Sequence, residues 1–138
     1  SPLSSLKFIK NLERKKLLIL QGATFALITV FLWVSPEKIV WTFEFVGNPN
    51  LTPYINFISV FLLSIGILSS ILASFPEEQL KDVCGAFGTM HLLFLIIKIH
   101  QLATTDSAFK PMAALGLTVT SAFILLFFNE SRKLSKQE

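Results

Sequence analysis

The chain is poor in the features on which soluble enzymes depend. Only 15% of its 138 residues are charged, whereas about a quarter is usual for a soluble domain. A single cysteine, Cys84, is present, which excludes an internal disulfide and a redox cysteine pair. The sequence also contains no glycine-rich phosphate loop and no His–Glu–x–x–His metal motif. These absences argue against a soluble fold and against common classes of enzyme.

Instead, the chain has long apolar runs that are almost free of charge. An α-helix rises 1.5 Å per residue, so about 20 residues cross the ~30 Å hydrocarbon core of a bilayer. Within lipid a backbone must satisfy its own hydrogen bonds, which favours helices over strands. We therefore predict an all-α integral membrane protein, an antiparallel bundle of four transmembrane helices in a domain spanning residues 17–129. The expected helices cover about residues 17–35, 53–75, 83–103 and 109–129.

The basic residues predict the topology of this bundle. Nine of them lie before the first run, after the last run or in the second connection. The first and third connections hold only Lys38 and Lys110. By the positive-inside rule, both termini should face the cytoplasm or the matrix or stroma of an organelle. Trp33, Trp41 and Tyr54 should lie at the opposite interface, where aromatic rings favour the headgroup region.

The segment before the first run has a composition of its own. Leu3, Leu6, Ile9 and Leu12 recur every third residue among basic side chains, after a Ser1-Pro2 helix-start signal. Residues 1–16 are therefore predicted to form a short amphipathic helix at the membrane interface. The alternative is a solvated basic tail that only sets the topology. Residues 130–138 should form a polar C-terminal tail.

Small residues predict how the helices pack, because they let helix backbones approach closely in lipid. The second and third connections are short, so the second, third and fourth helices should be antiparallel neighbours in a tight array. The expected packing positions are Ser59, Gly66, Ser70, Ala73, Gly85, Gly88 and Gly116.

The third run carries an intramembrane histidine. Cys84, His91 and Lys98 are spaced by seven and share one helix face, and His100 lies on another. His91 or His100 could be a ligand to haem or chlorophyll, or His91 a proton-relay group, although the sequence requires no cofactor. The alternative for His91 is an interhelical hydrogen bond. The partners considered for that bond are Ser59, Ser64, Thr118 and Thr120.

Lys98 and Asn56 are the other intramembrane polar residues of interest. Long cationic side chains near a helix end can extend to the interface, so Lys98 is expected mainly to anchor the third helix. Asn56 should lie at a similar depth and could accept a hydrogen bond from Lys98.

The segment Gly47-Asn48-Pro49-Asn50-Leu51, followed by His91 in the third helix, resembles the small four-helix scaffold proteins of endoplasmic-reticulum sterol biosynthesis. The similarity spans about residues 45–130, and only a few positions within that span are shared. The family has an Arg early in its second helix and a Glu shortly after the histidine, where this chain has Asn56 and Leu95. The resemblance implies a non-catalytic protein that holds membrane enzymes together.

We therefore expect a non-catalytic integral membrane subunit or scaffold that stabilises a larger assembly, such as an organellar respiratory or photosynthetic complex. Its partners would be other integral membrane proteins and lipids, with no nucleic acid. Two alternatives stay open: a cofactor-bearing subunit that uses His91 or His100, and a small enzyme or transporter for a lipid-like substrate.

Overall fold

The computed structural model describes residues 2–34, 52–104 and 111–135, and this part of the chain consists of helices with no strand. Trp41, the Gly47–Leu51 motif, Lys38 and Lys110 lie outside the described residues. The helices are α1 (Pro2–Val34), α3 (Thr52–Leu72), α4 (Glu77–Thr104) and α5 (Pro111–Ser135). An all-α fold is thus confirmed.

The helices extend beyond the apolar runs from which they were predicted. α1 is continuous from Pro2 to Val34, so the described residues 2–16 form one helix with the first apolar run. α4 begins at Glu77, directly after Pro76. Its first turn contains two glutamates, whose negative charges interact favourably with the positive end of the helix dipole. α5 begins with Pro111 at its first position, where a missing backbone N–H has no cost. Polar residues at these ends continue the helices because they are good helix formers and need no burial.

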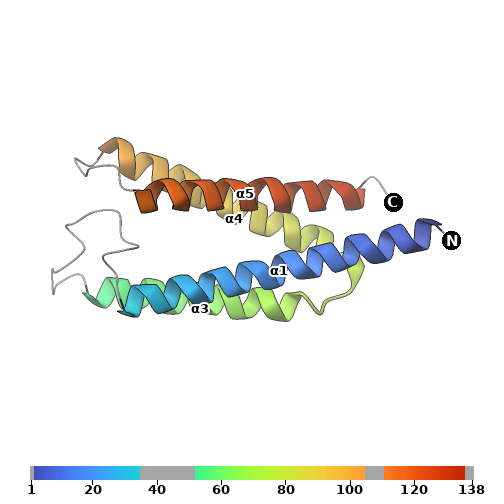
Figure 1. Cartoon of the computed structure of the whole chain (residues 1–138), viewed down its shortest axis with the longest axis horizontal. Helices are drawn as coiled ribbons and strands as arrows, with labels where there is room; N and C mark the ends of the chain where they lie inside the picture. The colour runs from blue at the N-terminus through green and yellow to red at the C-terminus, as the bar shows by residue number, and fades with distance from the viewer. Residues whose placement is uncertain (1, 35–51, 105–110, 136–138) are drawn as a thin grey trace.

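The four helices run alternately up and down (Figure 1). We call the end where α1 and α4 begin and α3 and α5 end the basal end, and the opposite end the distal end. Both chain termini lie at the basal end in Figure 1. This arrangement is the one that an even number of membrane crossings produces.

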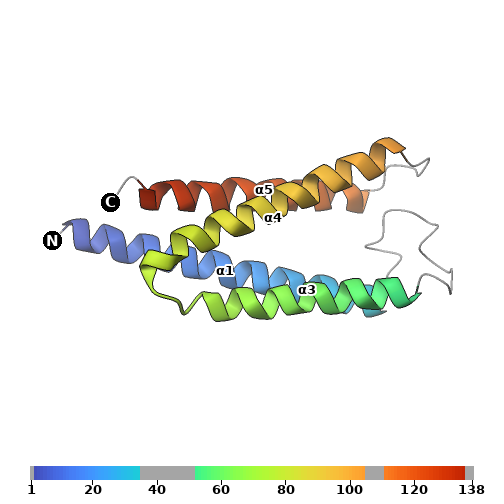
Figure 2. The same cartoon turned by 180° about the vertical axis from the view of Figure 1, so that it is seen from behind.

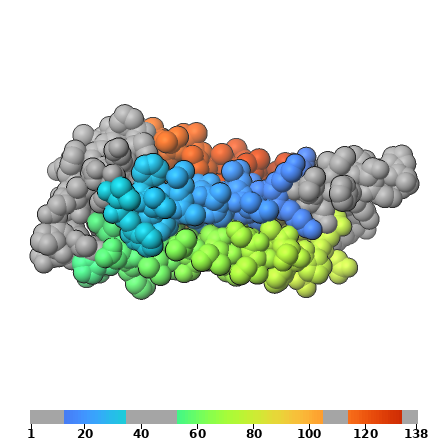
Figure 3. Space-filling model, turned by 60° about the horizontal axis from the view of Figure 1, so that its bottom comes forward, coloured from blue at the N-terminus to red at the C-terminus, as the bar shows by residue number. Residues whose placement is uncertain are grey.

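The helices associate as two pairs. α1 packs along α3, and α4 packs along α5, whereas contacts between the pairs are few and come mostly from α1. Figure 3 shows α1 and α3 side by side along one face of the molecule. α3 and α4 diverge toward the distal end (Figure 2). The expectation that α3 and α4 pack as neighbours is therefore wrong, because the short connection between them joins the pairs only at the basal end.

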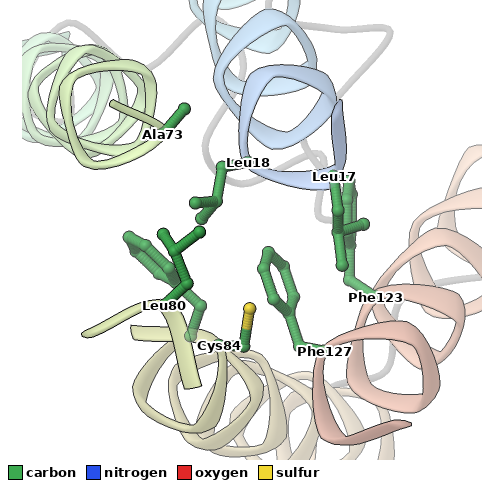
Figure 4. Close-up of a cluster of buried hydrophobic side chains, with 8 residues drawn as sticks. Leu17, Leu18, Ala73, Leu80, Cys84, Phe123 and Phe127 are labelled. Atoms are coloured by element: carbon green, nitrogen blue, oxygen red, sulfur yellow. The ribbon is translucent and has the colours of Figure 1, made fainter. Parts of the chain in front are cut away.

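The hydrophobic core lies in the basal half, where side chains of α1, α4 and α5 meet Ala73, the residue that directly follows α3 (Figure 4). Its centre is the Phe127 ring, which is fully buried together with Leu18, Leu80 and Cys84. The core consists of Leu17, Leu18, Ala73, Leu80, Cys84, Phe87, Phe123 and Phe127.

All four helices are long and apolar enough to cross a membrane. Their outward faces carry large exposed apolar side chains, for example Phe57, Leu27 and Leu125. Such a surface suits a lipid environment, so the structure indicates a multi-pass membrane protein.

Candidate functional site between the helices

A chain of hydrogen bonds connects α4, α1 and α3 beside the core. The Nε2 atom of His91 is hydrogen-bonded to Oε1 of Gln21. The Gln21 amide nitrogen donates to Oγ of Ser69 over 2.9 Å, and the Ser69 hydroxyl donates to the Leu18 carbonyl over 2.7 Å. His91 is 2% exposed, and Gln21 and Ser69 are fully buried.

The direction of these bonds assigns the protonation of the His91 ring. Because the Gln21 amide nitrogen donates to Ser69, its oxygen faces His91 and must accept. Nε2 of His91 therefore carries a proton. The chain of donors ends at the Leu18 carbonyl, which has no proton to pass on. The arrangement ties α4, α1 and α3 together.

Aromatic rings surround His91 on the sides not occupied by Gln21. The Phe123 ring stacks on the imidazole with centroids 4.9 Å apart, and the Phe127 ring lies at 5.8 Å. Phe25 of α1 approaches to 5.7 Å. A haem or chlorophyll bound through Nε2 would have to displace Gln21.

His100, the other candidate ligand, is exposed. It lies nine residues along α4 from His91 on a different face, so the structure does not bring the two histidines together.

The hydrogen-bond partner of His91 differs from those considered in the sequence. Ser59 instead donates to its own helix at the Ile55 carbonyl, and its carbonyl accepts from Thr29 over 3.2 Å. Thr120 is bonded to Lys98. Gln21 was not among the predicted partners of His91, because it is an uncharged residue inside the first apolar run. Its spacing from Leu18 and Phe25, three and four residues, was the signal that it shares their buried face.

A buried charge cluster lies at the basal end. The Arg14 side chain is fully buried, with Nη1 3.9 Å from Glu77 Oε1 of α4. Its Nε lies 3.7 Å from Glu130 Oε2 of α5. No nitrogen of the guanidinium has a hydrogen-bond partner within the part of the chain that the structure describes. These ion pairs are thus held by charge at distances too long for direct hydrogen bonds.

Arg14 was assigned from the sequence to the basic N-terminal segment. The continuity of α1 places it inside the bundle instead, one heptad before Gln21 and on the same buried face. It brings α1 against both helices of the other pair.

Lys98 lies in the distal half of α4, and its side chain is half-buried. Its ammonium donates to Oγ1 of Thr120 on α5 over 2.7 Å. Thr120 is 4% exposed. Asn56, the partner suggested by the sequence, is exposed near the distal end of α3. The hydrogen-bond acceptor of Lys98 is therefore the Thr120 hydroxyl on α5 and not Asn56.

The backbones of α1 and α3 approach closely at Gly22 and Gly66. A Cβ atom added to Gly22 would lie 2.8 Å from the Gly66 carbonyl oxygen and 2.5 Å from Ser70 Oγ. Gly22 had not been identified in the sequence, whereas Gly66 and Ser70 had.

The remaining predicted packing positions divide between the two pairs. Gly88 lies against the Phe128 ring and Gly85 against the Ser131 hydroxyl. Ser59 and Ala73 are buried, and Gly116 is half-buried on α5.

Comparison of the chain with protein-family models, with curated proteins and with solved structures finds no match. Within the described residues no group of three His, Cys, Asp or Glu side chains is placed to hold a metal ion.

Proposed function

We propose that this protein is a non-catalytic, multi-pass subunit that packs laterally against other integral membrane proteins and stabilises their assembly. One observation carries the proposal. The last buried residue of α4 is His91, although the helix continues for thirteen residues to Thr104. Among the residues that the structure describes, this distal half of a membrane-spanning helix has no fully buried side chain and packs mainly against α5.

The buried polar groups support the same function. His91, Gln21, Ser69 and Thr120 are occupied in bonds between helices. Such bonds stabilise a transmembrane bundle and orient its helices. A reactive site would require polar groups that converge on a space for substrate.

The topology proposed from the basic residues places the basal end, with its charged cluster, on the cytoplasmic, matrix or stromal side. Scaffolding is also what the resemblance of residues 45–130 to the sterol-biosynthesis scaffold family implies. The host assembly we propose is a membrane complex, including those of respiratory or photosynthetic organelles.

The proposal is tested on native membranes that contain the tagged full chain. The membranes are solubilised in a mild detergent, and the mass of the purified particle is measured by native mass spectrometry. We expect a stoichiometric complex with at least one other integral membrane protein. As a control, the same sample in a harsh detergent should release the single chain. A lone chain in mild detergent would contradict the proposal.

A further inference from the structure

Three basic side chains at the basal end are accessible and form no ion pair. Lys16 and Arg132 are exposed, and Lys15 is half-buried. None of the three has an ion pair or a hydrogen bond within the described residues. The neighbouring Arg14, in contrast, is fully buried and paired with two glutamates. We call Lys15, Lys16 and Arg132 the basal cations.

The outermost basal cations face away from the bundle. Lys16 lies two residues from the buried Arg14, and Arg132 lies two residues from the buried Glu130. Arg14 and Glu130 face each other across α1 and α5. Two residues turn an α-helix by about 200°, so Lys16 and Arg132 lie on the opposite sides of their helices from this contact. Each helix therefore presents its cation to the surrounding membrane.

The basal cations also lie at one depth. Because Nε of Arg14 is 3.7 Å from Oε2 of Glu130, these residues are at about the same level on two antiparallel helices. Lys16 is then about 3 Å distal of this level, and Arg132 about 3 Å basal of it. The apolar span of α5 ends at Arg132. Arg14 and Val34 are about 30 Å apart along α1, which equals the thickness of the hydrocarbon core. This depth is that of the lipid headgroups.

The exposed acids of α4 lie elsewhere on the basal end. Glu78 and Asp82 are exposed, and each is two residues from the buried Leu80, so both face away from the core. Among the described residues of α1 and α5, Glu13 is an exposed acid, and its contacts do not include the basal cations. The α1–α5 side of the basal end thus carries net positive charge. Further basic residues near these helix ends are Lys7, Lys10 and Lys133.

We infer that the α1–α5 side of the basal end binds acidic phospholipids of the adjoining leaflet through Lys15, Lys16 and Arg132. The inference does not depend on the proposed function. Cations without an ion pair favour a headgroup of net negative charge, because a zwitterionic headgroup already neutralises its own phosphate. Lysine side chains extend along apolar surface and keep their ammonium groups at the interface. A guanidinium can bind a phosphate through two parallel hydrogen bonds.

Lipid competition tests this inference. The full chain is reconstituted in nanodiscs that contain equal amounts of phosphatidylcholine and phosphatidylglycerol with the same acyl chains. The protein is released in a native mass spectrometer, and the lipids that stay bound are counted. We expect phosphatidylglycerol to be enriched about tenfold over phosphatidylcholine among the bound lipids. Equal retention of the two lipids would overturn the inference.

Two double variants with the same change in net charge locate the site. Lys15→Gln combined with Lys16→Gln should lower the enrichment about fivefold or more. Lys38→Gln combined with Lys110→Gln removes two cations from the first and third connections and should leave the enrichment unchanged. An equal decrease in both double variants would mean that the enrichment follows net charge alone, and it would overturn the inference.

Substitution of Arg132 shows whether α5 contributes to the site. Arg132→Gln should lower the enrichment about fivefold, whereas Arg132→Lys keeps the charge and should retain most of it. Arg132 is exposed, so neither change disturbs the core. An Arg132→Gln protein with the enrichment of the unchanged chain would overturn the assignment of the site to both helices.

Discussion

The basal and distal halves of the bundle differ in how the two helix pairs are joined. In the basal half, side chains of α1, α4 and α5 form one core around Phe127 together with Ala73, which directly follows α3. Arg14 and His91 also join the pairs there through charged and polar contacts. In the distal half, Thr29 bonds across α1 and α3, and Lys98 bonds across α4 and α5. Each of these distal contacts stays within one pair.

This difference shows what closes a helix bundle in lipid. Apolar burial alone does not favour one helix neighbour over another, because lipid chains are as apolar as leucine. Close backbone approach and polar contacts between specific helices supply the preference. The basal half has such contacts between the pairs, so it is closed. The comparison predicts a graded effect of substitutions on stability.

The largest effect is expected for Arg14→Met. The change removes the guanidinium whose Nε lies 3.7 Å from Oε2 of Glu130, a residue that is 6% exposed. Removing one partner of a buried ion pair costs about 3 kcal/mol or more. We expect this loss in the free energy of unfolding, measured by denaturant titration in mixed micelles. The control is Glu77→Gln, whose side chain is 35% exposed and should cost about 1 kcal/mol or less. Equal effects of the two changes would mean that Arg14 is not buried as described.

Gly22→Ala should be next in size. Its Cβ would lie 2.8 Å from the Gly66 carbonyl oxygen, a backbone atom that can move only if α1 and α3 separate. Overpacking of this kind costs about 2 kcal/mol. The matched control is Gly88→Ala, which meets the side-chain ring of Phe128 at 3.1 Å and should cost less. Thermal unfolding of both variants in the same detergent measures the difference. A Gly22→Ala protein as stable as the unchanged chain would show that the two helices lie further apart.

Gln21→Leu should have a smaller effect. It removes the hydrogen-bond acceptor of His91 and the donor to Ser69, and it leaves the buried imidazole unsatisfied. We expect a loss of about 1–2 kcal/mol. Adding His91→Phe should recover part of this loss, since both polar partners are then replaced by apolar groups. A double-mutant cycle of unfolding free energies measures the coupling. Strict additivity of the two changes would argue against the bond.

Thr29→Val, in the distal half, should have the smallest effect. The hydroxyl bonds the Ser59 carbonyl over 3.2 Å but also its own helix at Phe25, over 2.8 Å. Hydrogen bonds between transmembrane helices contribute about 0.6 kcal/mol on average, so the loss should not exceed this. The same denaturant titration tests it. An effect as large as that of Gln21→Leu would remove the contrast between the two halves.

Sequence patterns predicted some parts of the site and missed others for a physical reason. The face shared by Cys84, His91 and Lys98 follows from helical spacing alone, so it could be read directly. The partners of His91 and Lys98 depend on which helices meet and at what register. Arg14 was missed because its charge suggested exposure, and Gln21 because one amide in an apolar run changes the hydropathy little.

The sequence itself determined the number, approximate positions and alternation of the long helices in the described residues, because the apolar runs and the connections between them are local features of the chain. Tertiary structure alone decided that α3 pairs with α1 and not with α4. It also decided that Arg14 lies inside the bundle and that Lys98 donates a hydrogen bond to Thr120 of α5. The physical reason is that every helix here is apolar on most of its surface. Its inward face is therefore chosen by a few distant partners, such as Gly66 for Gly22 and Gln21 for His91.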